Sequence, residues 1–123
     1  MFARSSLKVA AAVGAIALLS ATQAAAHASL VKSDPAAGTT VSTPKTITLT
    51  FDEELTPAFS GFDVTMGDSM QVAVKTTVSA DHKTITGTLI GGHQMTGAYK
   101  ISWHAAAADD GHKSKGTVTF TVK

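Results

Sequence analysis

The sequence contains no cysteine, which excludes both disulfide bonds and thiolate metal sites. It also contains a single tryptophan and a single tyrosine. Once these two side chains are used in a core, few aromatic groups are left for a flat ligand-stacking surface. A fold without disulfides depends on hydrophobic packing, and any metal would have to be bound by histidine, methionine or carboxylate groups.

The N-terminal 26 residues have the pattern of a secretory leader. Arg4 and Lys8 supply positive charge, and residues 9–19 are apolar apart from one glycine. This run is shorter than the roughly 20 residues of a membrane-spanning helix, so an uncleaved membrane anchor is not expected. Ala24 and Ala26 form a small-x-small cleavage signal. We predict a signal peptide over residues 1–26, cleaved after Ala26, and export of the remainder.

The predicted mature domain, residues 27–123, has the length of one compact domain. It keeps eight lysines against nine acidic residues, a formal net charge of 8 − 9 = −1. Nucleic-acid binding is not expected, because no cluster of basic residues stands out in the sequence. We also expect no stable membrane insertion of the mature chain.

Cleavage after Ala26 would make His27 the first residue of the mature chain. Its terminal amine and its imidazole Nδ1 could then bind one metal ion in a six-membered chelate ring. Among the first-row divalent ions, copper(II) binds such nitrogen sites most tightly. The alternative is that histidine occupies this position by coincidence, and the junction alone does not exclude it.

Period-two alternation runs through the mature chain and predicts short β-strands. Residues 46–51 are the clearest case, with Ile47, Leu49 and Phe51 on one face and threonines on the other. No segment after residue 26 has a helical period. The fold class expected is all-β, an antiparallel Greek-key sandwich of immunoglobulin-like type with about seven to eight strands. The strands are expected near residues 29–32, 46–51, 62–66, 72–78, 84–89, 99–104 and 117–122.

Tyr99 follows a glycine turn at the start of a late strand, an arrangement typical of the tyrosine corner of Greek-key sandwiches. Trp103 lies four residues later on the same face and is expected inside, rather than on the surface as a binding platform. The predicted core contains Leu49, Phe51, Val64, Tyr99, Trp103, Val118 and Phe120.

Asp110 and His112 are separated by a single glycine in the loop before the last strand. In an extended segment this spacing points both side chains to the same side, so one carboxylate and one imidazole could meet at a common point. A solvated Asp-Gly turn is the alternative for this motif taken alone.

Taken together, these features resemble the CopC family of periplasmic copper-binding, copper-resistance proteins. The resemblance covers the whole mature chain. It rests on the His27 start and on the motifs in residues 33–38, 49–55, 59–61, 97–103 and 110–112.

The resemblance implies a Cu2+ site made by the amine and imidazole of His27, the carboxylate of Asp110 and the imidazole of His112. The chain carries one more residue between Trp103 and the Asp-x-His motif than is usual in the family, so Asp109 competes with Asp110 as the ligand. Asp110 is preferred because it keeps the one-residue spacing to His112. Two further contributors stay open, Glu53 and His104.

Some relatives carry a second, methionine-rich copper(I) site, since thioethers select copper(I). The corresponding stretch here, residues 66–70, is short and has no histidine. Met66 and Met95 are expected to pack in the core, which leaves Met70 and His93 as exposed candidates. We do not expect these residues to form a tight copper(I) site.

The expected function is therefore periplasmic copper(II) binding for sequestration, tolerance or delivery, with an inner-membrane copper transporter as the candidate partner. No enzymatic activity is expected. Two other functions fit part of the pattern. One is a copper mono-oxygenase of the polysaccharide-cleaving type, which also uses an N-terminal histidine chelate. The other is a metal-free interaction domain of immunoglobulin-like shape, which would need neither His27 nor the Asp-x-His motif.

Overall fold

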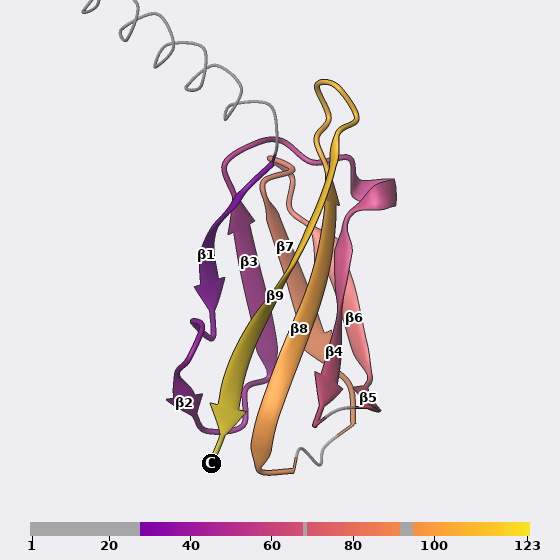
Figure 1. The fold of residues 1–123 in the computed structure, drawn as a ribbon. Coiled ribbons are helices and arrows are strands. Elements are labelled where there is room, and N and C mark those ends of the chain that lie inside the picture. Colours follow the sequence, from indigo (N-terminus) through magenta and orange to yellow (C-terminus); the bar gives the residue numbers. More distant parts are fainter. Residues whose placement is uncertain (1–27, 68, 92–94) are drawn as a thin grey trace, which may run out of the picture.

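Alternating apolar residues give β3 (Thr46–Phe51) one buried face, which carries Ile47, Leu49 and Phe51. The computed structural model describes residues 28–67, 69–91 and 95–123. Most of the other strands repeat this alternation, and they pack face to face in two layers (Figure 1). The predicted β-sandwich is confirmed.

Each layer is one β-sheet. The four-stranded sheet has the order β1 (Leu30–Asp34), β3, β7 (Thr84–Leu89) and β6 (Val74–Val78). The five-stranded sheet has the order β2 (Thr40–Val41), β9 (Lys113–Val122), β8 (Gly97–Ala106), β4 (Gly61–Met66) and β5 (Met70–Val72). One 3-10 turn, η1 (Pro57–Phe59), links the sheets between β3 and β4. No helix within the described residues is long and apolar enough to cross a membrane.

Two details differ from the expectation. The strand pairs are antiparallel except that the short β2 runs parallel to β9. The segment expected as one strand over residues 72–78 is divided, because the chain crosses from one sheet to the other at Ala73. Val72 and Val74 thus belong to different sheets, and both still pack against the shared core. A period-two pattern cannot reveal such a crossing, since either sheet satisfies it.

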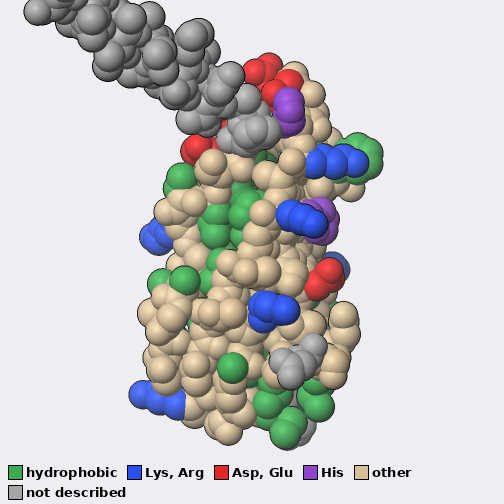
Figure 2. All heavy atoms as spheres, viewed as in Figure 1, with side chains coloured by type: hydrophobic (Ala, Val, Ile, Leu, Met, Phe, Trp, Pro, Cys, Tyr) green, Lys and Arg blue, Asp and Glu red, His purple; other side chains and the backbone are tan. Residues whose placement is uncertain are grey.

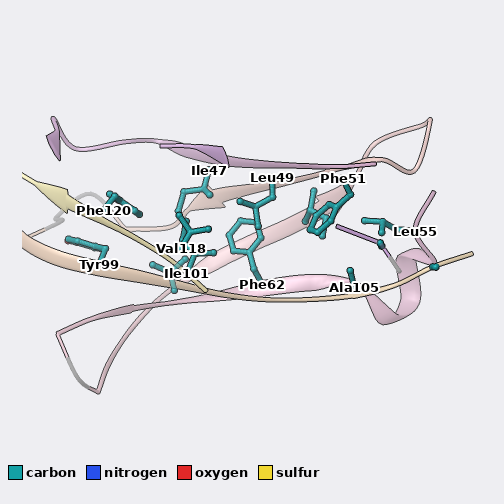
Figure 3. Packing of buried hydrophobic residues seen from close by; sticks show 14 of the residues in the cluster. Ile47, Leu49, Phe51, Leu55, Phe62, Tyr99, Ile101, Ala105, Val118 and Phe120 are labelled. Atoms are coloured by element: carbon teal, nitrogen blue, oxygen red, sulfur yellow. The ribbon is translucent and has the colours of Figure 1, made fainter. Parts of the chain in front are cut away.

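The core lies between the sheets, where side chains of β3 point toward those of β4, β8 and β9 (Figure 3). Six of the seven residues predicted for the core are buried. The seventh, Trp103, lies on the inner face and is partly buried. Its indole packs edge-on against Phe51, with 5.1 Å between the ring centroids, and lies over Gly116 of β9.

Glycine provides the space for another large ring between the sheets. Gly87 of β7 faces Phe62 of β4, and a methyl group at Gly87 would come within 2.8 Å of both Phe62 Cε1 and Val74 Cγ2. The missing side chain of Gly87 is therefore a packing requirement, because it accommodates the phenyl ring from the opposite sheet.

The tyrosine corner is present at the start of β8. The buried Tyr99 donates its hydroxyl hydrogen to the carbonyl oxygen of Met95 over 2.6 Å, and its ring stacks on Phe120 at 5.5 Å. This bond fixes the turn before β8 to the core.

Gly87→Ala should lower the free energy of unfolding by about 1–3 kcal/mol, the usual cost of forcing extra volume into a packed core. Gly61→Ala is the matched control, because the nearest atom to a methyl group there lies at 3.5 Å, an ordinary contact. Denaturant unfolding of both variants measures the difference. Equal stability of the two variants would contradict this account of Gly87.

Tyr99 is the only tyrosine in the chain, so the absorbance of phenolate reports it alone. Burial raises the pKa of Tyr99 above its ordinary value of 10.0, although the hydrogen bond to Met95 acts in the opposite direction. The folded protein should therefore titrate at higher pH than the chain unfolded in denaturant. Because the folded state holds the phenol proton more tightly, this contribution to stability is complete below about pH 10 and is lost as the pH rises through the raised pKa. A folded-state midpoint at or below that of the unfolded chain would contradict the burial of Tyr99.

Candidate metal centre

The loop between β8 and β9 carries Asp110 and His112 at one end of the sandwich. The backbone N–H of Ala107 donates to the carbonyl of His112, and the N–H of Gly111 donates to the carbonyl of Ala107, both at 2.9 Å. Gly111 has a φ of +74°, a conformation that glycine adopts without strain. This glycine thus lets the chain turn between the two candidate ligands.

Asp110 and His112 face each other across that turn. The distance between Asp110 Oδ2 and His112 Nδ1 is 3.0 Å, and Asp110 Oδ1 accepts a hydrogen bond from the backbone N–H of His112, also at 3.0 Å. The two side chains are 43% and 54% exposed, so a solvent ion can reach them. The predicted same-side arrangement of the carboxylate and the imidazole is present.

Hydrogen bonds from His112 hold the pKa of Asp110 below its ordinary value, the backbone N–H first and the side chain second. Asp110 is therefore a carboxylate at neutral pH, the form that binds a metal. Asp110 Oδ2 and His112 Nδ1 lie 3.0 Å apart and are hydrogen-bonded to each other, so the two groups are close enough to bind one ion once a metal replaces that bond.

The peptide unit between Ala28 and Ser29 is clamped on both sides. Its carbonyl oxygen, on Ala28, accepts a hydrogen bond from Ser114 Oγ at 2.9 Å, and its N–H, on Ser29, donates to Asp52 Oδ1 at 2.7 Å. Ser114 comes two residues after His112 in the sequence. The chain that immediately follows position 27 is thus bound to the strand that immediately follows the Asp-x-His motif. His27 itself lies outside the described residues, and its role as a ligand stays a prediction.

Neither Ser114 nor Asp52 was expected to matter from the sequence. A signal for Ser114 exists, since it falls in the inward phase of β9 together with Val118 and Phe120. A polar side chain at an inward position of a strand needs a hydrogen-bond partner, which here is the Ala28 carbonyl.

The neighbouring loops complete this end of the sandwich. The N–H of Ala108 donates to the carbonyl of Glu54 at 2.9 Å, and the N–H of Leu55 donates to the carbonyl of His82 at 2.7 Å. Between these loops is an open hollow of about 410 Å³ lined by Asp52, Glu53, Glu54, Lys83, Ala108 and Asp109. Glu53 and Asp109 thus face this hollow, whereas Asp110 pairs with His112. Within the described residues, no three histidine or acidic side chains are grouped closely enough to hold a metal ion.

Comparison with known proteins decides the family. The CopC domain model matches residues 30–123. The chain belongs to the CopC family.

Relatives of this CopC domain are named copper resistance proteins. The chain is 38% identical to copper resistance protein C of Xanthomonas campestris pv. juglandis, with all of both chains covered, and 37% identical to copper resistance protein C of Escherichia coli over 81% of this chain and 84% of that protein. Among solved structures, it is similar to PcoC, a methionine-rich copper resistance protein from E. coli, with a TM-score of 0.72 and 37% identity. That match covers 80% of this chain and all of the other. CopC from Methylosinus trichosporium OB3b gives a TM-score of 0.71 at 26% identity, over 79% of this chain and 94% of the other.

His104 of this CopC domain lies on the outer face of β8, opposite Lys115 of β9 and Gly61 of β4. It lines a separate hollow beside Phe59 and Lys113. Within the described residues, His104 belongs to no metal-binding cluster with Asp110 and His112.

Three methionines line one hollow of about 210 Å³, Met66, Met70 and Met95. Met66 packs partly against the core, as expected. The expectation that Met95 packs in the core is wrong, since its side chain is 58% exposed. The tyrosine corner uses the carbonyl oxygen of Met95, and the Met95 side chain points away from the core into solvent. His93 lies outside the described residues, and the absence of a tight copper(I) site stays a prediction.

Ser114→Ala should release the Ala28–Ser29 peptide unit on one side. We expect a loss of about 1 kcal/mol in the free energy of unfolding and faster hydrogen exchange of the Ser29 amide. Ser42→Ala is the control, since Ser42 is an exposed serine away from this end. Unchanged exchange at Ser29 in Ser114→Ala would show that the clamp does not restrain the start of the domain.

Proposed function

We propose that this CopC protein binds copper(II) with a site completed only after removal of residues 1–26. The ligands are the terminal amine and imidazole of His27, a carboxylate oxygen of Asp110 and the imidazole of His112. Three nitrogens and one oxygen suit the tetragonal geometry of copper(II), and Asp110 neutralises one of its two charges. The copper ion is the cargo of the protein.

The clamp on the Ala28–Ser29 peptide unit is the observation that carries this proposal. Ser114 Oγ and Asp52 Oδ1 hold the residues directly after His27 beside the β8–β9 loop. A ligand on residue 27 therefore needs only one residue of chain to reach the neighbourhood of Asp110 and His112. The contact between Asp110 Oδ2 and His112 Nδ1, at 3.0 Å, adds support, because it already brings the carboxylate and the imidazole together.

The protein acts outside the cytoplasm, in the periplasm, as a sequestering or delivering protein rather than an enzyme. The leader-like residues 1–26 support export, and the names of the relatives support a role in copper resistance. The carboxylate of Asp110 occupies a position that a copper mono-oxygenase would keep open for oxidant or substrate. Tyr99 is buried and Trp103 faces inward, so neither provides a stacking platform for a polysaccharide. Delivery would be to an inner-membrane copper transporter.

Adding a single glycine before His27 should weaken copper(II) binding by more than about 100-fold. The extension keeps every side chain but converts the terminal amine into a peptide amide, which is not a ready ligand at neutral pH. His112→Ala should have an effect of similar size, beyond the 10–100-fold loss that follows removal of a group that only orients a ligand. Competition titrations against a copper(II) chelator measure both variants beside the mature protein.

His82→Ala is the matched control, because His82 is an exposed histidine on the β6–β7 hairpin, and its affinity should stay within about twofold of the mature protein. If the glycine-extended protein binds copper(II) as tightly as the mature one, the chelate proposal is wrong. If His112→Ala alone keeps full affinity, the Asp-x-His motif is not part of the site.

A further inference from the structure

An exposed aromatic residue stands beside the candidate metal centre. Phe59 ends η1, which has no buried residue, and its side chain is 60% exposed. It borders a hollow of about 240 Å³ lined by Ala58, Phe59, His104, Ala105, Lys113 and Ser114. Exposure of this apolar ring to water is unfavourable, so contact between the ring and another apolar group is favoured.

One lysine, Lys113, lines this hollow, and two more lie further along the same outer face. The ammonium group of Lys113 lies 5.8 Å from the centroid of the Phe59 ring, within the range of a cation–π contact. Lys115 and Lys100 follow on the outer face of β9 and β8, where Lys115 pairs across the strands with His104. Figure 2 shows lysine side chains spaced down this face, an acidic side chain among them at mid-height, and further acidic side chains at the upper end of the molecule. Asp63 of β4 is exposed on this outer face, where it pairs with Ser102 of β8.

The hollow is adjacent to both segments that the metal proposal uses. Lys113 directly follows His112, and Ser114 holds the carbonyl oxygen of Ala28. A side chain seated in the hollow would therefore contact the residues that anchor the candidate ligands. A partner bound there would have the metal within reach.

We propose that the hollow bordered by Phe59, Lys113 and His104 is the docking site for an acidic segment of a partner protein, with one apolar side chain of that segment packed against Phe59. Lys113 at the hollow, with Lys115 and Lys100 further along the same face, favours carboxylates, and the apolar part of the wall favours a single inserted side chain. The inference rests on the proposed copper function, because the partner that docks here would be the protein that gives or receives the copper ion.

A protein segment fits this surface better than an anionic membrane does. Asp109, Asp110 and Glu54 are exposed at the adjoining end of the molecule. A flat anionic bilayer that contacted Phe59 and Lys113 would also approach these carboxylates and be repelled by them. A narrow acidic segment can occupy the hollow and remain clear of them.

The test is a titration of the copper-free mature protein with the acetylated, amidated peptide Glu-Glu-Leu-Glu-Glu, followed by the NMR shifts of backbone amides. The peptide has no histidine, cysteine or methionine. We expect shift changes centred on residues 58–59, 104–105 and 113–114 that weaken with added salt. Lys113→Glu and Phe59→Ala should each reduce the affinity for the peptide at least about tenfold. Lys75→Glu, which makes the same charge change on an exposed position of β6, should leave the affinity unchanged.

No shift changes at these residues, or equal affinity in Lys113→Glu and Lys75→Glu, would overturn the docking proposal. Binding to vesicles of phosphatidylglycerol and phosphatidylcholine in place of the peptide would overturn it in favour of a membrane surface. The copper titrations are separate, so loss of the chelate proposal would leave the peptide result standing, and the reverse is also true. Phe59→Ala should keep its affinity for copper(II), which separates docking from metal binding.

Discussion

Two hydrogen bonds to one peptide unit determine what this end of the protein can do. Ser114 Oγ and Asp52 Oδ1 bind opposite sides of the Ala28–Ser29 peptide unit. Each bond contributes on the order of 1 kcal/mol, a small share of the stability of a domain. Their effect on position is larger, because they fix the start of the domain against the strand that follows the Asp-x-His motif. Ala28 is also buried in the core, and the carbonyl of Ser29 accepts a hydrogen bond from the N–H of Asp52, so these contacts act together with the two bonds.

The sandwich makes this arrangement possible by joining its two sheets at one end. β1 belongs to the four-stranded sheet, and β9 belongs to the five-stranded sheet. The start of β1 and the start of β9 meet where Ser114 reaches Ala28. Residues separated by more than 80 positions in the sequence thus become neighbours. The same β8–β9 hairpin that carries Asp110 and His112 also supplies Tyr99, Ile101 and Val118 to the core, so the loop stands on a rigid base.

Charge is divided between two neighbouring surfaces. Acidic side chains line the hollow at the metal end, where they favour the approach of a cation. Lysines occupy the outer face of β8 and β9, where they favour an acidic protein surface. The formal net charge of the chain is +1, so the total does not reveal this separation. The proposed metal site and the proposed docking site thus lie on surfaces of opposite charge.

The sequence by itself determined the fold class, most of the core and the Asp-x-His pair, because all three depend on local spacing. Alternation assigns Leu49 and Phe51 to one face whatever the sheet order, and a single glycine between Asp110 and His112 sets their separation. Tertiary structure alone decided the crossing between β5 and β6, the parallel pairing of β2, the fit of Phe62 over Gly87 and the exposure of Met95. It also decided that Lys100 of β8 shares an outer face with Lys113 and Lys115 of β9 and that Ser114 meets Ala28. These features depend on contacts between segments that are distant in the sequence. The alternation of residues within one strand does not indicate which distant segment will pack against that strand.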